Sequence, residues 1–198
     1  SNREDHETSL KEKKLDDSGN EVDLVIEDRD DYFYIMKEEF NYKNARNFIM
    51  SFQEGILRPI LKSTDIPEKE FDENGIRTIV GQNFDDIVLT KDNDMIILFY
   101  VDWCEHCKNF IPIFSRAAKH FKDYNKLVFA KMNYEDNIAP PEYLVKAYPT
   151  LYFAQSHSKK NPIKYDKKSK DGFPELVSFI MSHLTFPKLE EKSLSDEL

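Results

Sequence analysis

The sequence predicts an α/β fold in which helices cover both faces of a central sheet. Three observations carry this prediction. Residues 95–101 form a continuous apolar run, typical of a strand at the centre of a covered sheet. Residues 110–121 place apolar side chains at helical spacing, and strand-like and helix-like segments alternate from Thr78 to the closing helix. With 198 residues, of which 40% are hydrophobic, the chain can hold one ordinary domain and a substantial extension.

The second part of the chain supplies the elements of this fold in order. A short strand at 78–80 and a short helix at 83–89 precede the buried strand. The long helix that follows contains Pro112, which is expected to kink it. The remaining elements are strands at 127–132, 150–153 and 163–165, and a helix at 173–184 with Pro174 in its first turn. Residues 76–186 are therefore predicted to form the principal domain.

The first part of the chain predicts too little structure for a domain of its own. Two short strands at 23–26 and 32–35 and one helix at 44–54 would bury only a weak core. Residues 1–62 are therefore interpreted as the end of a larger domain whose front half is missing. Residues 63–75, with Pro67 and several charges, are predicted to be a linker.

Composition argues against several classes of function. The formal net charge of -9, with no concentrated stripe of Lys and Arg, argues against nucleic acid as a partner. No apolar run is long enough to cross a bilayer, so membrane insertion is not expected. The two cysteines lie three positions apart, without the second ligand pair of a zinc site, so no metal is expected.

The chemistry is predicted to lie at the two cysteines, where the central strand ends and the long helix begins. Unpaired N–H groups and the positive end of the helix dipole favour the thiolate of Cys104, and a protonated His106 would add to this. The spacing lets Cys107 reach Cys104 and close a small disulfide. A chance pair or half of a metal site are the alternatives, but the strand-to-helix position favours a redox pair.

The sequence around these cysteines resembles the protein disulfide isomerase family. The resemblance lies in Phe-Tyr-Val-Asp-Trp-Cys-Glu-His-Cys-Lys-Asn at residues 99–109. Upstream, Glu-Gly-Ile-Leu-Arg-Pro at 54–59 and Val-Gly-Gln-Asn-Phe at 80–84 are similar to that family's passage into its last catalytic domain. The resemblance implies a thioredoxin-like fold with a central mixed sheet, preceded by the end of a non-catalytic thioredoxin-like domain.

The same resemblance implies an activity and its partners. Cys104 would attack and Cys107 would resolve, so the redox-active disulfide of these two residues would replace any separate cofactor. The reaction would form, reduce and rearrange disulfides in unfolded or misfolded client proteins, with glutathione or an oxidase as the electron partner. The family's proline opposite the cysteines is cis, which implies that Pro149, with Tyr148 and Trp103, binds an extended substrate segment.

The last four residues suggest a location. Ser195, Asp196, Glu197 and Leu198 resemble the signal that returns proteins to the endoplasmic reticulum, although the first position differs from the commonest form. Residues 187–198 are therefore predicted to be a tail with a retention signal, and the lumen is the expected location. The chain shows no signal peptide, so a further N-terminal part of the natural protein is expected.

Three positions depart from the family's usual residues. Glu105 replaces a glycine and should oppose thiolate formation at Cys104, which would make the site a weaker oxidant. Leu98 replaces the buried acid that relays the proton of the second thiol. The usual partner of that acid survives as Lys131. Without the acid, Lys131 would either be a neutral amine that takes the proton of the second thiol or, as we favour, extend its ammonium to water. Lys146 stands in place of a mobile arginine.

Two other functions compete with this one. A chaperone-like module would bind clients through apolar surface around Trp103 and Phe110, with weak redox activity. A general cytosolic reductase is disfavoured by the terminal tetrapeptide and by His106.

Overall fold

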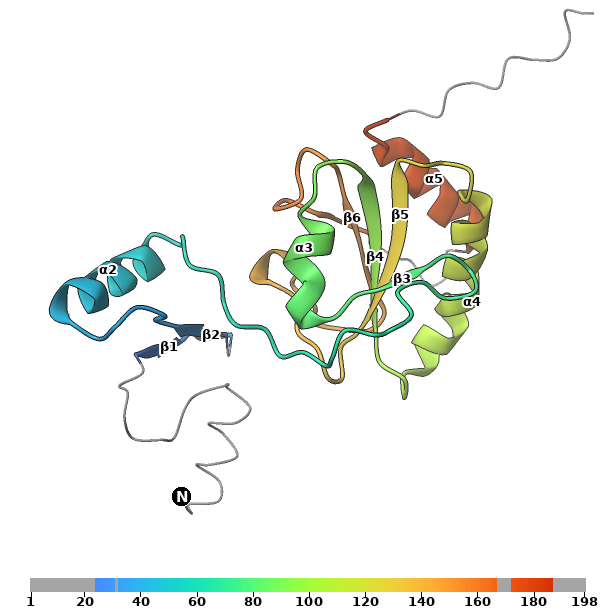
Figure 1. Cartoon of the computed structure of the whole chain (residues 1–198). Helices are drawn as coiled ribbons and strands as arrows, with labels where there is room; N and C mark the ends of the chain where they lie inside the picture. Colours follow the sequence, from blue (N-terminus) through green and yellow to red (C-terminus); the bar gives the residue numbers. More distant parts are fainter. Residues whose placement is uncertain (1–23, 31, 167–171, 187–198) are drawn as a thin grey trace, which may run out of the picture. The chain divides into compact units, whose positions relative to one another are not determined.

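The computed structural model describes residues 24–30, 32–166 and 172–186 (Figure 1). The chain divides into two compact units, residues 1–62 and residues 63–198. The predicted retention signal at Ser195, Asp196, Glu197 and Leu198 lies outside the described residues.

The first unit contains a two-stranded antiparallel sheet and one helix. Strand β1 (Val25–Glu27) pairs with β2 (Phe33–Ile35). The side chain of Asp28 closes the turn between them by accepting the N–H groups of Asp30 and Tyr32 at 2.9 and 3.0 Å. Helix α2 (Tyr42–Gln53) begins after Asn41, because the side chain of Asn41 accepts the N–H of Asn44. The predicted strands and helix are therefore confirmed to within two residues at each end.

A small core holds this unit together. Tyr32, Tyr34, Met36 and Phe48 are buried, and the rings of Tyr34 and Phe52 meet edge to face at 5.0 Å. That these residues end a non-catalytic thioredoxin-like domain stays a prediction.

The second unit is built on a five-stranded mixed sheet in the order β3-β5-β4-β6-β7. Strands β3, β5 and β4 are parallel, whereas β6 and β7 run antiparallel to their neighbours. The strands are β3 (Arg77–Thr78), β4 (Asp94–Tyr100), β5 (Leu127–Asn133), β6 (Thr150–Ala154) and β7 (Ile163–Lys164). The helices are the 3-10 turns η1 (Gly81–Asn83) and η2 (Pro141–Tyr143), and α3 (Phe84–Val88), α4 (Glu105–His120) and α5 (Phe173–His183).

Helices cover both faces of this sheet, as the sequence predicts. Helix α3 lies on one face and α4 with α5 on the other (Figure 1). Alternate residues of β4 divide between the faces, as the pleat of a strand requires. Phe99 packs against Tyr143 of η2, whereas Ile96 and Leu98 belong to the core beneath α4 and α5. The side chain of Lys131, in register with Leu98 on the parallel neighbour β5, is brought to this second face.

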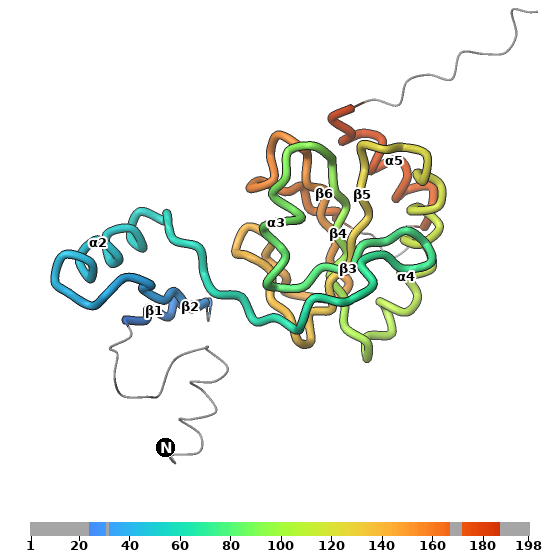
Figure 2. Tube along the Cα trace, in the orientation of Figure 1, coloured from blue at the N-terminus to red at the C-terminus, as the bar shows by residue number. Residues whose placement is uncertain are grey.

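The segment predicted as a linker belongs to the second unit. Phe71 forms a bridge with Arg77, and the N–H of Thr78 donates to the carbonyl oxygen of Glu70 at 2.9 Å. The turn between them runs from Asp72 to Gly75, and the φ of Gly75 is +75°. Figure 2 shows this turn just ahead of β3. At the other end of the segment, the hydroxyl of Ser63 accepts the N–H of Gln82. The prediction of a linker over residues 63–75 is therefore corrected, because its backbone and side chains hydrogen-bond to the domain.

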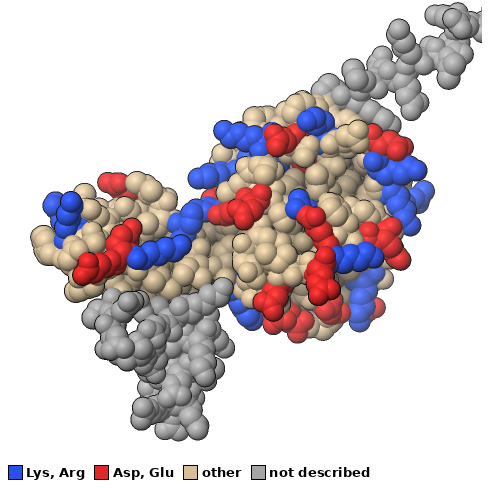
Figure 3. All heavy atoms as spheres, viewed as in Figure 1, with Lys and Arg blue, Asp and Glu red and all other residues tan. Residues whose placement is uncertain are grey.

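On the face that Figure 3 shows, basic and acidic side chains are interspersed over the second unit. None of the helices in the described part of the chain has the length and apolar character to cross a membrane.

Candidate active site

The two cysteines lie at the start of helix α4. Strand β4 ends at Tyr100, and Cys104 is the N-cap residue of the helix that begins at Glu105. The backbone N–H of Cys107 donates to the Sγ of Cys104 at 3.2 Å. The same N–H also donates to the carbonyl oxygen of Cys104 at 3.1 Å. This N–H and the positive end of the helix dipole, which lies here, both favour a thiolate at Cys104.

The two sulfur-bearing residues differ in access to solvent. Both are thiols in this structure, with Cys104 8% and Cys107 1% exposed. Tyr100, Ile111, Tyr134 and Tyr148 pack against the cluster that the two cysteines form with Val101. A substrate can therefore approach Cys104 more readily than Cys107, which suits an attacking and a resolving thiol.

Three predicted substrate-binding residues lie beside Cys104. The Tyr148–Pro149 peptide bond is cis, and the Sγ of Cys104 donates to the carbonyl oxygen of Tyr148 at 3.6 Å. The ring of Trp103 meets that of Tyr148 edge to face at 6.2 Å and is 68% exposed. The structure thus brings Trp103, Tyr148 and Pro149 to the cysteines, while their contact with substrate stays a prediction.

The charged residues of the motif face solvent. Glu105 and His106 are exposed, and the carboxylate of Glu105 lies 3.5 Å from the ammonium of Lys108 one turn along the helix. That neighbour and the solvent both weaken the effect of Glu105 on Cys104. Lys146 is exposed in the segment that leads to Tyr148. The roles predicted for Glu105, His106 and Lys146 stay predictions.

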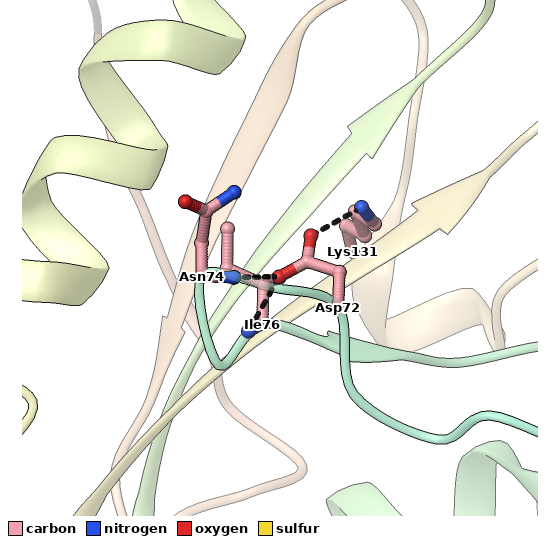
Figure 4. Close-up of polar contacts among 4 residues, drawn as sticks. All are labelled: Asp72, Asn74, Ile76 and Lys131. Carbon is pink, nitrogen blue, oxygen red and sulfur yellow. Dashed lines mark hydrogen bonds and ion pairs between the residues drawn. The ribbon is translucent and has the colours of Figure 1, made fainter.

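Lys131 has an acidic partner that the sequence analysis did not foresee. Its ammonium donates to Oδ2 of Asp72 at 2.6 Å, and both side chains are about a quarter exposed (Figure 4). The hypothesis of a lysine without an acid is therefore wrong. Burial alone would raise the pKa of Asp72, but the hydrogen bonds from Lys131, Ile76 and Asn74 outweigh it and lower that pKa.

The pKa values of two tyrosines that pack against the cysteines are raised. Burial raises the pKa of Tyr148, and the negative charge of the Cys107 thiolate raises it further. Burial also raises the pKa of Tyr100, with added contributions from the carboxylates of Asp102 and Asp72. Tyr100, which packs on the cysteines, therefore lies within electrostatic reach of Asp72.

Sequence reasoning missed Asp72 and Tyr100 and misplaced Phe110. Phe110 is 1% exposed in the core, so it offers no client surface, contrary to the chaperone alternative. The run Asp-Glu-Asn-Gly at residues 72–75 is a turn signal that could have indicated ordered structure before β3. Among the residues that the structure describes, no three His, Cys, Asp or Glu side chains gather as a metal site would require.

Comparisons with known proteins identify the family of this chain. The thioredoxin family model matches residues 75–180. Protein disulfide-isomerase A4 of Mus musculus is 38% identical over 184 residues, which cover 92% of this chain and 28% of that protein. Protein disulfide-isomerase A3 of Gallus gallus is 34% identical over 174 residues, which cover 86% of this chain and 33% of that protein. This chain thus spans no more than about a third of either relative.

One solved structure among the similar ones is the first thioredoxin domain of mouse protein disulfide-isomerase A4. It is 27% identical, with 64% of this chain and 88% of that chain covered and a TM-score of 0.47.

Proposed function

The chain belongs to the thioredoxin family and, within it, to the protein disulfide-isomerases, and from this premise we propose that its second unit exchanges thiols and disulfides with client proteins. One observation carries the proposal. Cys104 caps helix α4 with its sulfur bonded to the N–H of Cys107, directly beside the cis Tyr148–Pro149 bond. That arrangement supplies an activated sulfur, a resolving sulfur and a backbone edge for substrate.

The first step uses Cys104. Its thiolate attacks one sulfur of a client disulfide, a mixed disulfide forms, and the other client sulfur leaves as a thiolate. The N–H of Cys107 and the helix dipole stabilise the attacking thiolate, which speeds this step at neutral pH. The exposed ring of Trp103 offers an apolar contact for the client.

The second step decides whether the result is reduction or isomerisation. If Cys107 attacks the Sγ of Cys104, the client leaves reduced and the enzyme is oxidised. If a different client thiol attacks first, the client leaves with a rearranged disulfide and the enzyme keeps both thiols. We propose glutathione or an oxidase as the partner that restores the redox state, and the endoplasmic reticulum lumen as the location, which the tetrapeptide at 195–198 supports.

The proposal is tested by reactivating a substrate with scrambled disulfides in a glutathione buffer. Recovery is expected with the parent chain and is expected to fall to the rate of the buffer alone with Cys104→Ser. The Cys107→Ser variant, which keeps the attacking sulfur, is the matched control and should retain partial isomerase activity. Equal recovery with the parent and with Cys104→Ser would contradict the proposal.

A chaperone-like binding module is the second candidate. The observation that favours it is the apolar ring of Trp103, which lies next to Cys104 in the chain and is 68% exposed. Suppression of the aggregation of a cysteine-free client by both the parent and Cys104→Ser would show such binding. The two functions are compatible, because exposed apolar side chains also hold a client during exchange.

A further inference from the structure

A small cavity lies at the end of the sheet that is far from the cysteines. It is lined by Leu89 and Lys91, which follow helix α3, and by residues 156–161 in the loop between β6 and β7. Both segments adjoin the point where β4 begins, because β6 runs antiparallel to β4 and ends beside Met95 (Figure 1). The seven residues of β4 span about 20 Å between this point and the segment that leads to α4. The cavity is therefore distinct from the proposed active site.

The lining of this cavity, whose volume is about 320 Å³, is rich in positive charge and in hydrogen-bond donors. It consists of Lys91, Lys159 and Lys160, with His157, two serines, one asparagine and one leucine. The chain has 37 acidic and 28 basic side chains, yet none of the described residues that line this cavity carries a carboxylate. A larger cavity of about 470 Å³ beside β3 is lined instead by both lysines and carboxylates. The charge on the lining of the smaller cavity therefore favours an anion.

Two consecutive turns shape the loop that forms most of this lining. The N–H groups of Ser158 and Asn161 each donate to the carbonyl oxygen three residues earlier, at 3.0 Å. These backbone bonds hold the loop without using the side chains that line the cavity. His157 and Lys160 are exposed, whereas Lys159 between them is buried. Lys159 therefore lies at the base of the cavity and its two neighbours lie at the rim.

The backbone holds the ammonium of Lys159 in place. Lys159 is 5% exposed, and its ammonium donates to the carbonyl oxygens of Asn93 and Ala154 at 2.6 and 3.1 Å. These two acceptors come from the two segments between which the cavity lies. An ammonium has three N–H groups, so one donor remains beyond these two bonds. A ligand in the cavity can therefore accept from Lys159 without displacing either carbonyl oxygen.

The positive charge of Lys159 has no carboxylate bonded to it among the described residues. Asp94 is near enough to act on this charge, but its two oxygens accept backbone N–H groups at 2.8 and 2.6 Å. Burial outweighs the attraction of Asp94 and lowers the pKa of Lys159 to about 8. A buried charge without a bonded partner is unfavourable, and an anion in the cavity would supply that partner.

The kinds of side chain in the lining indicate which anion fits. A planar carboxylate pairs best with the guanidinium of arginine, and no described arginine lines this cavity. Lysine binds phosphate as a point charge, and the hydroxyl of Ser158 and the amide of Asn161 can donate to further phosphate oxygens. A volume near the lower limit of small-molecule sites, which span about 300–1,000 Å³, favours a small ligand. The lining therefore favours a phosphate group on a small molecule.

We propose that this cavity binds phosphate, either as the free anion or as a small phosphomonoester, with Lys159 at its base and Lys91 and Lys160 at its rim. The bound anion accepts from the buried ammonium of Lys159 and attracts the two exposed lysines, which come from different segments. The site is independent of thiol-disulfide exchange, because it lies at the opposite end of β4 from the cysteines.

NMR titration tests this binding, with inorganic phosphate and glycerol 3-phosphate as the two probes. Each is added to the ¹⁵N-labelled chain at neutral pH in a phosphate-free buffer, with sodium chloride adjusted to keep the ionic strength constant. Saturable shifts are expected for the backbone amide signals of residues 156–161 and of Lys91, and the signals of Cys104 and Cys107 should not move. Tighter binding of glycerol 3-phosphate would identify a phosphomonoester as the preferred ligand, and tighter binding of inorganic phosphate would identify the free anion.

Variants separate a built site from general attraction to a positive surface. The double variant Lys91→Met with Lys160→Met removes both rim charges at exposed positions and is expected to raise the dissociation constant at least about threefold. Lys119→Met, which removes an exposed lysine of α4 outside the cavity, is the matched control and should keep the parent's constant. Lys159→Met should abolish saturable binding, and if it does not fold, the rim variant decides alone.

Three results would overturn the proposal. One is the absence of saturable shifts with either probe at tens of millimolar, and another is shifts scattered over the exposed lysines of the whole surface. The third is an equal dissociation constant for the parent and the rim variant. Because the titration follows binding and needs no catalysis, its failure is distinct from a failure of the proposed function.

Discussion

Lys159 shows how a single residue couples the fold to pH. It is 5% exposed, and its ammonium donates to the carbonyl oxygens of Asn93 and Ala154 at 2.6 and 3.1 Å. Burial lowers the pKa of Lys159 to about 8, and the nearby carboxylate of Asp94 opposes this effect without cancelling it. Folding therefore makes the charged form of this side chain less favourable.

The sign of the pH dependence follows from this shift. The folded protein releases the proton of Lys159 near pH 8, but the unfolded chain keeps it up to its ordinary pKa of 10.5. Between these values the unfolded chain binds more protons, so the free energy of unfolding rises with pH. Urea unfolding between pH 7.5 and 9.5 is expected to show this rise, and Lys159→Met is expected to remove it.

Lys160 is the matched control for that measurement. It is exposed, so Lys160→Met should keep the parent's slope of stability against pH. The buried tyrosines have raised pKa values and would act in the opposite sense only at higher pH, which is why the series stops at 9.5. Identical slopes for the parent and Lys159→Met would contradict the account.

At the scale of elements, helix α4 joins the active site to the core. Its first turn carries the cysteines, while further along Phe110, Phe114 and Ala117 are buried against the sheet. Phe114 is 1% exposed, and its ring lies 5.2 Å from that of Phe129 on β5. The position of the cysteines thus depends on how this helix packs.

Truncating this contact should be costly. Phe114→Ala is expected to lower the free energy of unfolding by about 3–5 kcal/mol, through lost burial and the cavity left behind. Urea unfolding measures the change, and the exposed Lys119→Ala on the same helix should stay within about 0.5 kcal/mol of the parent. A loss below about 1 kcal/mol for Phe114→Ala would mean that this face does not anchor the helix.

The sequence predicts those elements whose burial leaves a periodic or continuous pattern. Strand β4 is apolar throughout its interior, and the buried face of α4 repeats at helical spacing, so both could be found without the structure. Strand β3, of two residues, owes its existence to pairing with β5, which is distant in sequence. Such pairing leaves little local signal, and its boundaries were predicted less well.

The same reasoning separates the predictable part of the site from the rest. Cys104 and Cys107 could be predicted because they lie three positions apart, and this short spacing lets them form a disulfide with each other. Asp72 could not, because its pairing with Lys131 joins residues 59 positions apart and its segment resembles a polar linker. Only the turn that its Oδ1 closes has a local signature, in the residues from Asp72 to Gly75.

For the molecule as a whole, the proposed chemistry lies within the second unit. Both cysteines and the cis Tyr148–Pro149 bond lie between residues 63 and 198. The chain covers 28% of protein disulfide-isomerase A4 of Mus musculus. The proposed reaction is therefore assigned to this unit and not to a complete protein of that length. The claim specific to this chain is the division of labour between its two cysteines.

That division is tested most directly by trapping the mixed disulfide. A peptide with one internal disulfide is mixed with the reduced Cys107→Ser and Cys104→Ser variants, quenched with acid, and analysed by mass spectrometry. The account predicts a peptide adduct on Cys104 that accumulates in Cys107→Ser, with little adduct in Cys104→Ser because Cys107 is buried. Equal adducts in the two variants, or more on Cys107, would contradict the assignment of Cys104 as the attacking thiol.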